Sequence, residues 1–160
     1  MQLLLVRHGR AESRAASGRD ADRVLTPEGI AELRRVLALA HRAGVRPSLI
    51  QASPLARAVQ TAEIAAQVLG YRGEIVRTTS LVPESSPAQV WEEIRVHSGE
   101  PSLMLVGHEP LLSAMVAALL GSTRPMIQFA AGGLVRIHIE GFSAQPAGVL
   151  EWMITPDLIP

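Results

Sequence analysis

The sequence predicts an α/β fold with three layers, α/β/α, built on a mostly parallel sheet that carries an antiparallel edge strand. Two observations carry this prediction. From residue 2 to residue 120, short apolar runs alternate with segments whose apolar side chains recur at helical spacing, as in chains of β-α units. Near the carboxyl terminus, two segments alternate apolar and polar residues, which is typical of strands with one solvated face.

The first strand is predicted over Gln2–Val6, because this nearly continuous apolar run is typical of a buried strand. Arg10–Arg23 is polar and has no clear period, so we expect a long loop, and loops of this length are often functional. Thr26-Pro27 then predicts the start of a helix, with Thr as its cap and Pro at its first position. Gly44 and Pro47 predict its end.

The middle of the chain repeats this pattern. A short strand over Leu49–Ala52 is followed by Ser53-Pro54, a second cap-and-proline signal, and by a helical stripe that stops at Gly70. Three further elements are predicted before residue 110, a strand, a helix and a strongly apolar strand: Glu74–Arg77, Pro87–His97 and Ser102–Val106. An apolar helix is expected from there to Leu120.

The last two strands are predicted around residues 135–139 and 150–154, where apolar and polar side chains alternate. The residues between them, Gly141–Gly148, indicate a loose turn. The sequence contains no internal repeat or linker, so we expect residues 1–160 to form a single domain.

Composition excludes several classes of protein. Hydrophobic residues make up 48% of the chain and the formal net charge is zero, which argues against disorder, general nucleic-acid binding and a polybasic membrane surface. All 15 basic residues are Arg and there is no Cys, so lysine chemistry, thiolate nucleophiles and Cys-ligated metals are excluded. The first apolar run is too short for a signal peptide, and we expect a cytoplasmic protein that acts neither on a membrane nor on nucleic acid.

Polar residues follow three of the predicted strands at the point where each strand ends. They are Arg7-His8-Gly9, Ser53-Pro54 with Arg57 on the next helical turn, and Gly107-His108-Glu109-Pro110. The carboxyl ends of parallel strands share one edge of a sheet, where ligands of α/β proteins bind. Two guanidinium groups, two imidazoles and two helix N-termini can therefore meet there, and Arg side chains and helix N-termini both select phosphate.

Two histidines in a phosphate site indicate covalent phosphoryl transfer. A neutral imidazole can attack phosphorus, provided that one ring nitrogen is free and the other is held as a donor. Cationic groups would neutralise the phosphoryl oxygens, and a carboxyl group could protonate the leaving group. No glycine-rich loop of the G-x-x-x-x-G-K-[ST] type is present, so binding of a nucleoside triphosphate is not predicted.

Four motifs, in this order, resemble those of the histidine phosphatase superfamily, which has the phosphoglycerate-mutase-like fold. They are Leu5–Gly9, Leu25–Gly29, Ser53–Ala62 and Val106–Pro110. The resemblance spans nearly the whole chain and is greatest to the small SixA-type phosphohistidine phosphatases, including the segment Glu151–Pro156.

The resemblance implies a role for each matching residue. His8 would be the nucleophile, Arg7 and Arg57 would clamp the phosphoryl oxygens, and His108 would donate to the same oxygens. Gly9, Arg23 and Ser53 are further candidates for contact with the substrate. Neither a metal nor a cofactor is implied, because the cationic side chains would neutralise the charge of the phosphoryl oxygens.

The general acid is left open among three alternatives. The resemblance to larger members of the family favours Glu84, another branch of the superfamily favours the position of Glu109, and a third alternative needs neither. A phosphoramidate is labile once its nitrogen is protonated, so a strong acid matters less for such a substrate.

We therefore expect a phosphatase that forms a phosphohistidine intermediate and acts on phosphohistidine in a protein, such as the phosphotransfer domain of a two-component relay. The segments between the motifs are short and Thr78–Ala88 is the only candidate lid, so the site is expected to be open to a protein substrate. The alternatives are a small-molecule phosphomonoesterase of the same superfamily, and an inactive phosphate-binding regulatory module.

Overall fold

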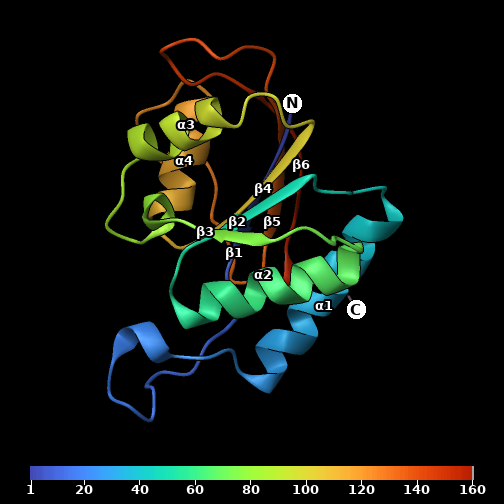
Figure 1. The fold of residues 1–160 in the computed structure, drawn as a ribbon, viewed down its shortest axis with the longest axis vertical. Helices are drawn as coiled ribbons and strands as arrows, with labels where there is room; N and C mark the ends of the chain where they lie inside the picture. Colours follow the sequence, from blue (N-terminus) through green and yellow to red (C-terminus); the bar gives the residue numbers. More distant parts are fainter. Residues whose placement is uncertain (160) are drawn as a thin grey trace.

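A computed structural model describes residues 1–159 (Figure 1). The strands are β1 (Gln2–Arg7), β2 (Leu49–Ala52), β3 (Ile75–Arg77), β4 (Ser102–Gly107), β5 (Leu134–His138) and β6 (Val149–Ile154). The helices are α1 (Pro27–Arg42), α2 (Ala56–Leu69), α3 (Pro87–Val96) and α4 (Leu111–Leu119). Short 3-10 turns lie at Asp20–Asp22, Thr79–Leu81 and Pro156–Leu158.

The strands form one sheet in the order β3-β2-β4-β1-β5-β6. The first four strands of the chain run parallel, whereas β5 is antiparallel to β1 and β6 is antiparallel to β5. The predicted fold class is confirmed, with antiparallel pairing confined to the β5-β6 side of the sheet. The predicted strands are recovered to within a residue or two at each end.

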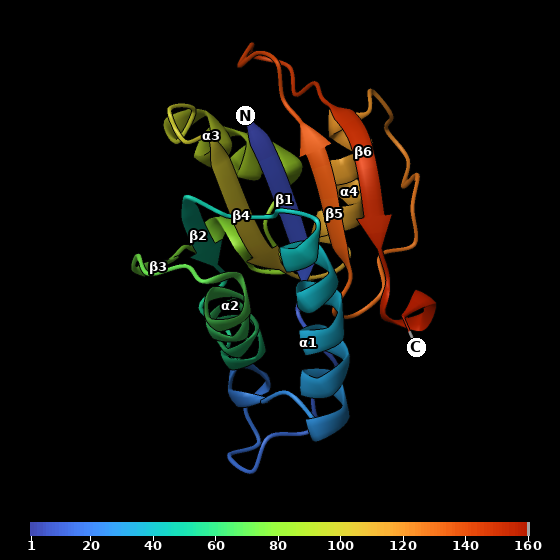
Figure 2. The same cartoon turned by 90° about the vertical axis from the view of Figure 1, so that its right-hand side faces the viewer.

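The helices cover both faces of the sheet (Figure 2). Side chains of β1 alternate between the two cores: Leu3 and Leu5 pack with α3 and α4, and Leu4 and Val6 pack with α1 and α2. Burying an aliphatic side chain of this size contributes about 1.5–3 kcal/mol. The continuous apolar run of β1 is therefore explained by a strand that is buried on both faces.

The start of α2 corrects one expectation. Ser53-Pro54 resembles the Thr26-Pro27 signal, and Thr26 does cap α1 by accepting a hydrogen bond from the amide of Gly29 at 3.0 Å. At α2, however, the helix begins at Ala56 and the N-cap residue is Leu55, which supplies no side-chain hydrogen bond. The Ser53 hydroxyl accepts a hydrogen bond from the amide of Leu55 at 3.4 Å, before the helix begins, and also contacts His108.

The topology leaves a crevice at one edge of the sheet. After β1 the chain turns to α1 on one face, and after the neighbouring β4 it turns to α4 on the other face. The carboxyl ends of β1 and β4 therefore flank a topological switch point, which is where open α/β sheets bind ligands. The loop between β1 and α1 extends below this edge (Figures 1 and 2).

Candidate active site

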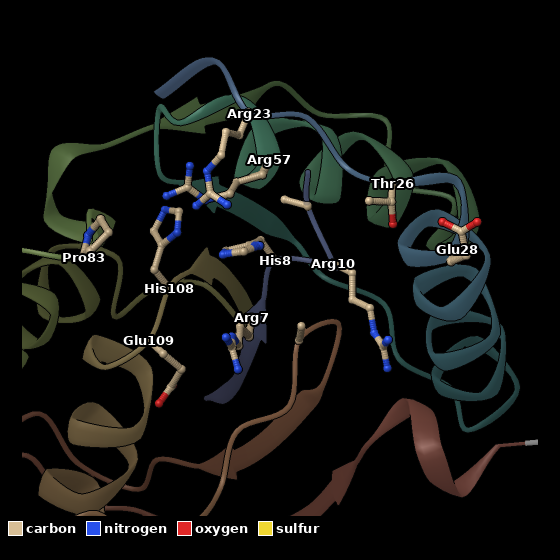
Figure 3. Close-up of a pocket in the computed structure, with 12 residues that line it drawn as sticks. Arg7, His8, Arg10, Arg23, Thr26, Glu28, Arg57, Pro83, His108 and Glu109 are labelled. Atoms are coloured by element: carbon tan, nitrogen blue, oxygen red, sulfur yellow. The ribbon is translucent and has the colours of Figure 1, made fainter. Parts of the chain in front are cut away.

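A cavity of about 620 Å³ opens at the carboxyl ends of β1 and β4. Its lining includes Arg7, His8, Arg23, Arg57 and His108, so the structure brings together five of the predicted site residues (Figure 3). They come from four separate parts of the sequence, and the register that pairs Arg7 with Gly107 sets His8 beside His108.

His8 is oriented by backbone groups on both of its sides. Its amide donates to the carbonyl oxygen of Gly107 at 3.0 Å, and its Nδ1 lies 2.7 Å from the carbonyl oxygen of Gly9. A carbonyl oxygen can only accept, so Nδ1 carries the proton and Nε2 keeps a free lone pair. Burial, together with the charges of Arg57 and Arg7, lowers the pKa of His8 to about 4, so the ring is neutral near pH 7.

His108 lies against His8, with ring centroids 4.9 Å apart. Its Nε2 is 2.8 Å from the hydroxyl oxygen of Ser53, and its Nδ1 is buried without a hydrogen-bond partner. If the hydroxyl donates to Nε2, Nδ1 carries the proton and can donate to a phosphoryl oxygen. Burial and the neighbouring His8 and Arg57 lower the pKa of His108 to about 3.

Arg7 and Arg57, the two arginines predicted to bind the phosphoryl oxygens, are each held by a hydrogen bond to a backbone carbonyl oxygen. Arg7 donates from Nη1 to the carbonyl oxygen of Phe129 at 2.6 Å, and Arg57 donates from Nη1 to the carbonyl oxygen of Asp20 at 2.9 Å. The Nε atom of each guanidinium is buried and has no hydrogen-bond partner. Both side chains line the cavity, and guanidinium groups recognise phosphate through paired N–H groups.

Arg23 joins this group from the loop between β1 and α1. Its guanidinium donates to the carboxylate of Asp20 and to the carbonyl oxygen of Glu12, both at 2.8 Å. Asp20 is not among the predicted site residues, because the loop has no periodicity that sets it apart. The spacing Asp20-Ala-Asp-Arg23 offered a signal, since an acidic residue three positions before an arginine can pair with it within one turn.

Gly9 and Ser53 support the histidines from behind the cavity. The amide of Gly9 donates to the hydroxyl of Thr61 at 3.1 Å, and a Cβ at Gly9 would meet the carbonyl oxygen of Gly29 at 3.2 Å. Ser53 is fully buried and contacts His108. Neither residue is among those that line the cavity, so their predicted contact with the substrate stays a prediction.

The acidic candidates differ in position. Glu84 is exposed and only its neighbour Pro83 lines the cavity. Glu109 lines the cavity, but its carboxylate accepts hydrogen bonds from the amide of Ser113 at 3.1 Å and from the Ser113 hydroxyl at 2.5 Å. Figure 3 shows its carboxylate turned away from the two imidazoles. Glu28 lines the side of the cavity formed by α1.

Other polar groups lie outside the site. His97 contacts Gln51 and Glu93 between α3 and the sheet, while His41 and His138 are half-buried elsewhere. Among residues 1–159, no group of three His, Asp or Glu side chains is arranged to hold a metal ion. Within the same range, no helix is long and apolar enough to span a bilayer.

The low pKa values of the two imidazoles predict a pH-dependent stability. In the unfolded chain a histidine has a pKa of about 6.5, whereas His8 and His108 have values of about 4 and about 3 when folded. The unfolded state therefore binds more protons below about pH 6.5, and stability that is fully present above that pH is lost as the pH falls. Urea unfolding at about pH 7 and about pH 5 should show a lower free energy of unfolding at the acidic pH.

A double variant supplies the control for this prediction. Replacing both groups, His8→Asn with His108→Asn, should remove most of the difference between the two pH values. An equal pH dependence in the wild type and the double variant would mean that other groups cause it.

The cavity holds a neutral imidazole with a free lone pair, two oriented guanidinium groups and a second imidazole. These are the groups that phosphoryl transfer through a covalent phosphohistidine requires. Sequence comparison agrees. The sequence model of the histidine phosphatase superfamily, branch 1, matches residues 3–81, which include Arg7, His8 and Arg57. An uncharacterized protein of Picosynechococcus is 34% identical over 142 residues, which cover 86% of this chain and 85% of that protein. The chain belongs to the histidine phosphatase superfamily.

Solved structures place it more closely within that class. The protein histidine phosphatase SixA in complex with tungstate is 27% identical, with a TM-score of 0.87 over 99% of both chains. A protein of Agrobacterium tumefaciens assigned as phosphohistidine phosphatase SixA is also 27% identical, with a TM-score of 0.80 over 97% of this chain and 98% of that chain. The phosphoserine phosphatase of Entamoeba histolytica, at 16% identity and a TM-score of 0.70 over 97% of each chain, shares the fold. The protein is thus a SixA-like phosphatase in structure.

Proposed function

We propose that this phosphatase acts on phosphohistidine in a protein. The observation that supports this substrate most directly is the state of Glu109, which commits both carboxylate oxygens to Ser113. An alkyl phosphate ester needs an acid to protonate its leaving oxygen, and general acids contribute about 10²–10⁴-fold. The imidazole nitrogen of a phosphohistidine accepts a proton more readily, so the enzyme needs less help from a carboxyl group.

The openness of the site supports a substrate carried by a protein. The candidate lid, Thr78–Ala88, contributes Pro83 to the cavity lining, and its remaining residues do not line the cavity. A mutase must retain its intermediate and exclude water, which requires closure over the site. The likeness to SixA at 27% identity is consistent with the same substrate class.

The proposed reaction has two displacements. Nε2 of His8 attacks phosphorus, and the P–N bond to the substrate breaks. The nitrogen that loses phosphorus takes a proton from solvent, so the substrate leaves as a neutral imidazole. Water then attacks phosphohistidine-8 and releases inorganic phosphate, which restores the neutral imidazole. In both steps Arg7, Arg57 and His108 hold the phosphoryl oxygens as they pass between partners.

The test is to mix the protein with a phosphorylated histidine phosphotransfer domain and to follow phosphate release. We expect release from this substrate to exceed that from small phosphate esters at equal concentration. If small esters turn over fast and the phosphorylated domain does not, the protein is a small-molecule phosphomonoesterase. If neither is hydrolysed, it is a phosphate-binding module.

The leaving group also predicts the behaviour of the acidic candidates. We expect Glu84→Gln and Glu109→Gln each to change phosphohistidine hydrolysis by less than about threefold, because protonation of the nitrogen does not depend on them. The two variants are compared by single-turnover kinetics, with Glu92→Gln on the exposed side of α3 as the control. A loss of about tenfold or more in one variant only would identify that residue as the general acid.

A further inference from the structure

One carboxylate binds two of the cationic side chains of the site. Asp20 accepts a hydrogen bond from Nη2 of Arg57 at 3.1 Å on one oxygen and from Nε of Arg23 at 2.8 Å on the other. Its backbone carbonyl also accepts from Nη1 of Arg57 at 2.9 Å. Arg57 is thus held by two separate atoms of one residue, although its side chain is only 4% exposed and that of Asp20 is 67% exposed.

Asp20 lines a different hollow from the one that contains the two imidazoles. It does not line the cavity that holds His8 and His108. It lines a separate hollow of about 360 Å³ within the loop of residues 13–23, and Arg23 lines both spaces. Asp20 and Arg23 therefore share this second hollow.

The contacts use only part of the hydrogen-bonding capacity of Arg57. Asp20 occupies one N–H on each of the two Nη atoms, which leaves the second N–H of each Nη atom for a ligand in the cavity that Arg57 lines. A guanidinium has five N–H groups in a fixed plane, so the two contacts with Asp20 also fix the direction of these remaining N–H groups. The charge balance is also suitable: Arg7, Arg23 and Arg57 with Asp20 sum to +2, which matches a doubly charged phosphoryl group.

We propose that Asp20 is a positioning residue, which orients Arg57 and Arg23 toward the phosphoryl group on His8 and joins the loop of residues 13–23 to the site. The inference rests on phosphoryl transfer at this site but not on which substrate supplies the group. Asp20→Asn removes the charge while keeping the shape and the backbone carbonyl. The matched control is Asp22→Asn, since Asp22 lies in the same 3-10 turn and contacts only Ser17 and Arg19.

The first experiment measures p-nitrophenyl phosphate hydrolysis and the binding of inorganic phosphate by calorimetry. We expect Asp20→Asn to lower kcat/KM by about tenfold to a hundredfold, as misplaced catalytic groups do, and to raise the Kd for phosphate by about fivefold. Asp22→Asn should stay within about twofold of the wild type in both. Thermal unfolding of each variant checks that the fold is retained.

The second experiment separates positioning from general damage to the loop. With Arg57→Lys in place the planar guanidinium is gone and only the contact of Asp20 with Arg23 remains. Adding Asp20→Asn should therefore lower kcat/KM by a smaller factor than it does in the wild type. A full and additive loss in the double variant would overturn the proposal. So would equal behaviour of Asp20→Asn and Asp22→Asn.

A third result would also overturn it. If Asp20→Asn binds phosphate more tightly at an unchanged kcat, Asp20 only weakens the positive field of the site. Phosphate binding remains informative even if the wild type hydrolyses no phosphohistidine, so a wrong substrate proposal and a wrong role for Asp20 give different results.

Discussion

We expect replacement of His8 with alanine to lower phosphatase turnover by about a thousandfold or more, because it removes the proposed nucleophile. The geometry singles out this imidazole. The Gly9 carbonyl oxygen holds Nδ1 as a donor at 2.7 Å, which leaves the lone pair of Nε2 free. The variant is assayed with p-nitrophenyl phosphate. In a second experiment the wild type is quenched with alkali during turnover of a substrate labelled on its phosphate, because phosphohistidine is stable in alkali.

The label should map to the peptide that contains His8, and the alanine variant should carry none. His138→Ala is the matched control, because His138 is half-buried on β5 and pairs with Gln2 at the opposite edge of the sheet. It should retain activity within about twofold. Label on another histidine, or full turnover by the His8 variant, would contradict the nucleophile assignment.

The second large effect is expected from Arg57→Lys, which keeps the charge and removes the planar fork. Arg57 contacts Asp20 through one N–H on each Nη atom and lines the cavity that contains His8. A lysine ammonium is a point donor that cannot serve both sides in fixed geometry. Loss of one preoriented donor to a transition-state oxygen costs about 10²–10³-fold, and we expect a decrease of that size in kcat/KM.

Arg10→Lys is the control for this variant. Arg10 lines the same cavity, but its side chain is 65% exposed and pairs with Glu32 at 3.0 Å. The conservative change there should alter kcat/KM by less than about threefold. Equal effects at the two positions would show that charge alone, and not the shape of the guanidinium, matters at residue 57.

Much of the site could be predicted from strand ends. Arg7 and His8 follow an apolar run that had to be buried, and His108 follows another, so parallel pairing of the two strands was enough to bring the histidines together. Arg57 was correctly predicted to lie in the first turn of α2, although the predicted N-cap, Ser53, differs from the observed N-cap, Leu55. The apolar pattern therefore predicted the core, and the core predicted where the candidate catalytic side chains lie.

Other parts of the site depend on contacts that no pattern encodes. The carbonyl of Phe129, which holds Arg7, belongs to a residue 122 positions away in a loop. Asp20 lies in a stretch without periodicity, so its contact with Arg57 depends on how the loop folds back. The Ser53 hydroxyl accepts a hydrogen bond from the amide of Leu55 just before α2 and also contacts His108, and the second contact depends on a residue 55 positions away.

The pairing of Arg7 with Gly107 in the register of β1 and β4 has a consequence for how such proteins diversify. The two imidazoles are attached to strands that are buried on both faces, so they are inherited together with the core. The rim of the cavity is instead supplied by the 10–25 loop, by Pro83 and by Ala131. Natural variation or design can therefore rewrite these loops to admit new phosphorylated molecules while the reaction itself is left intact.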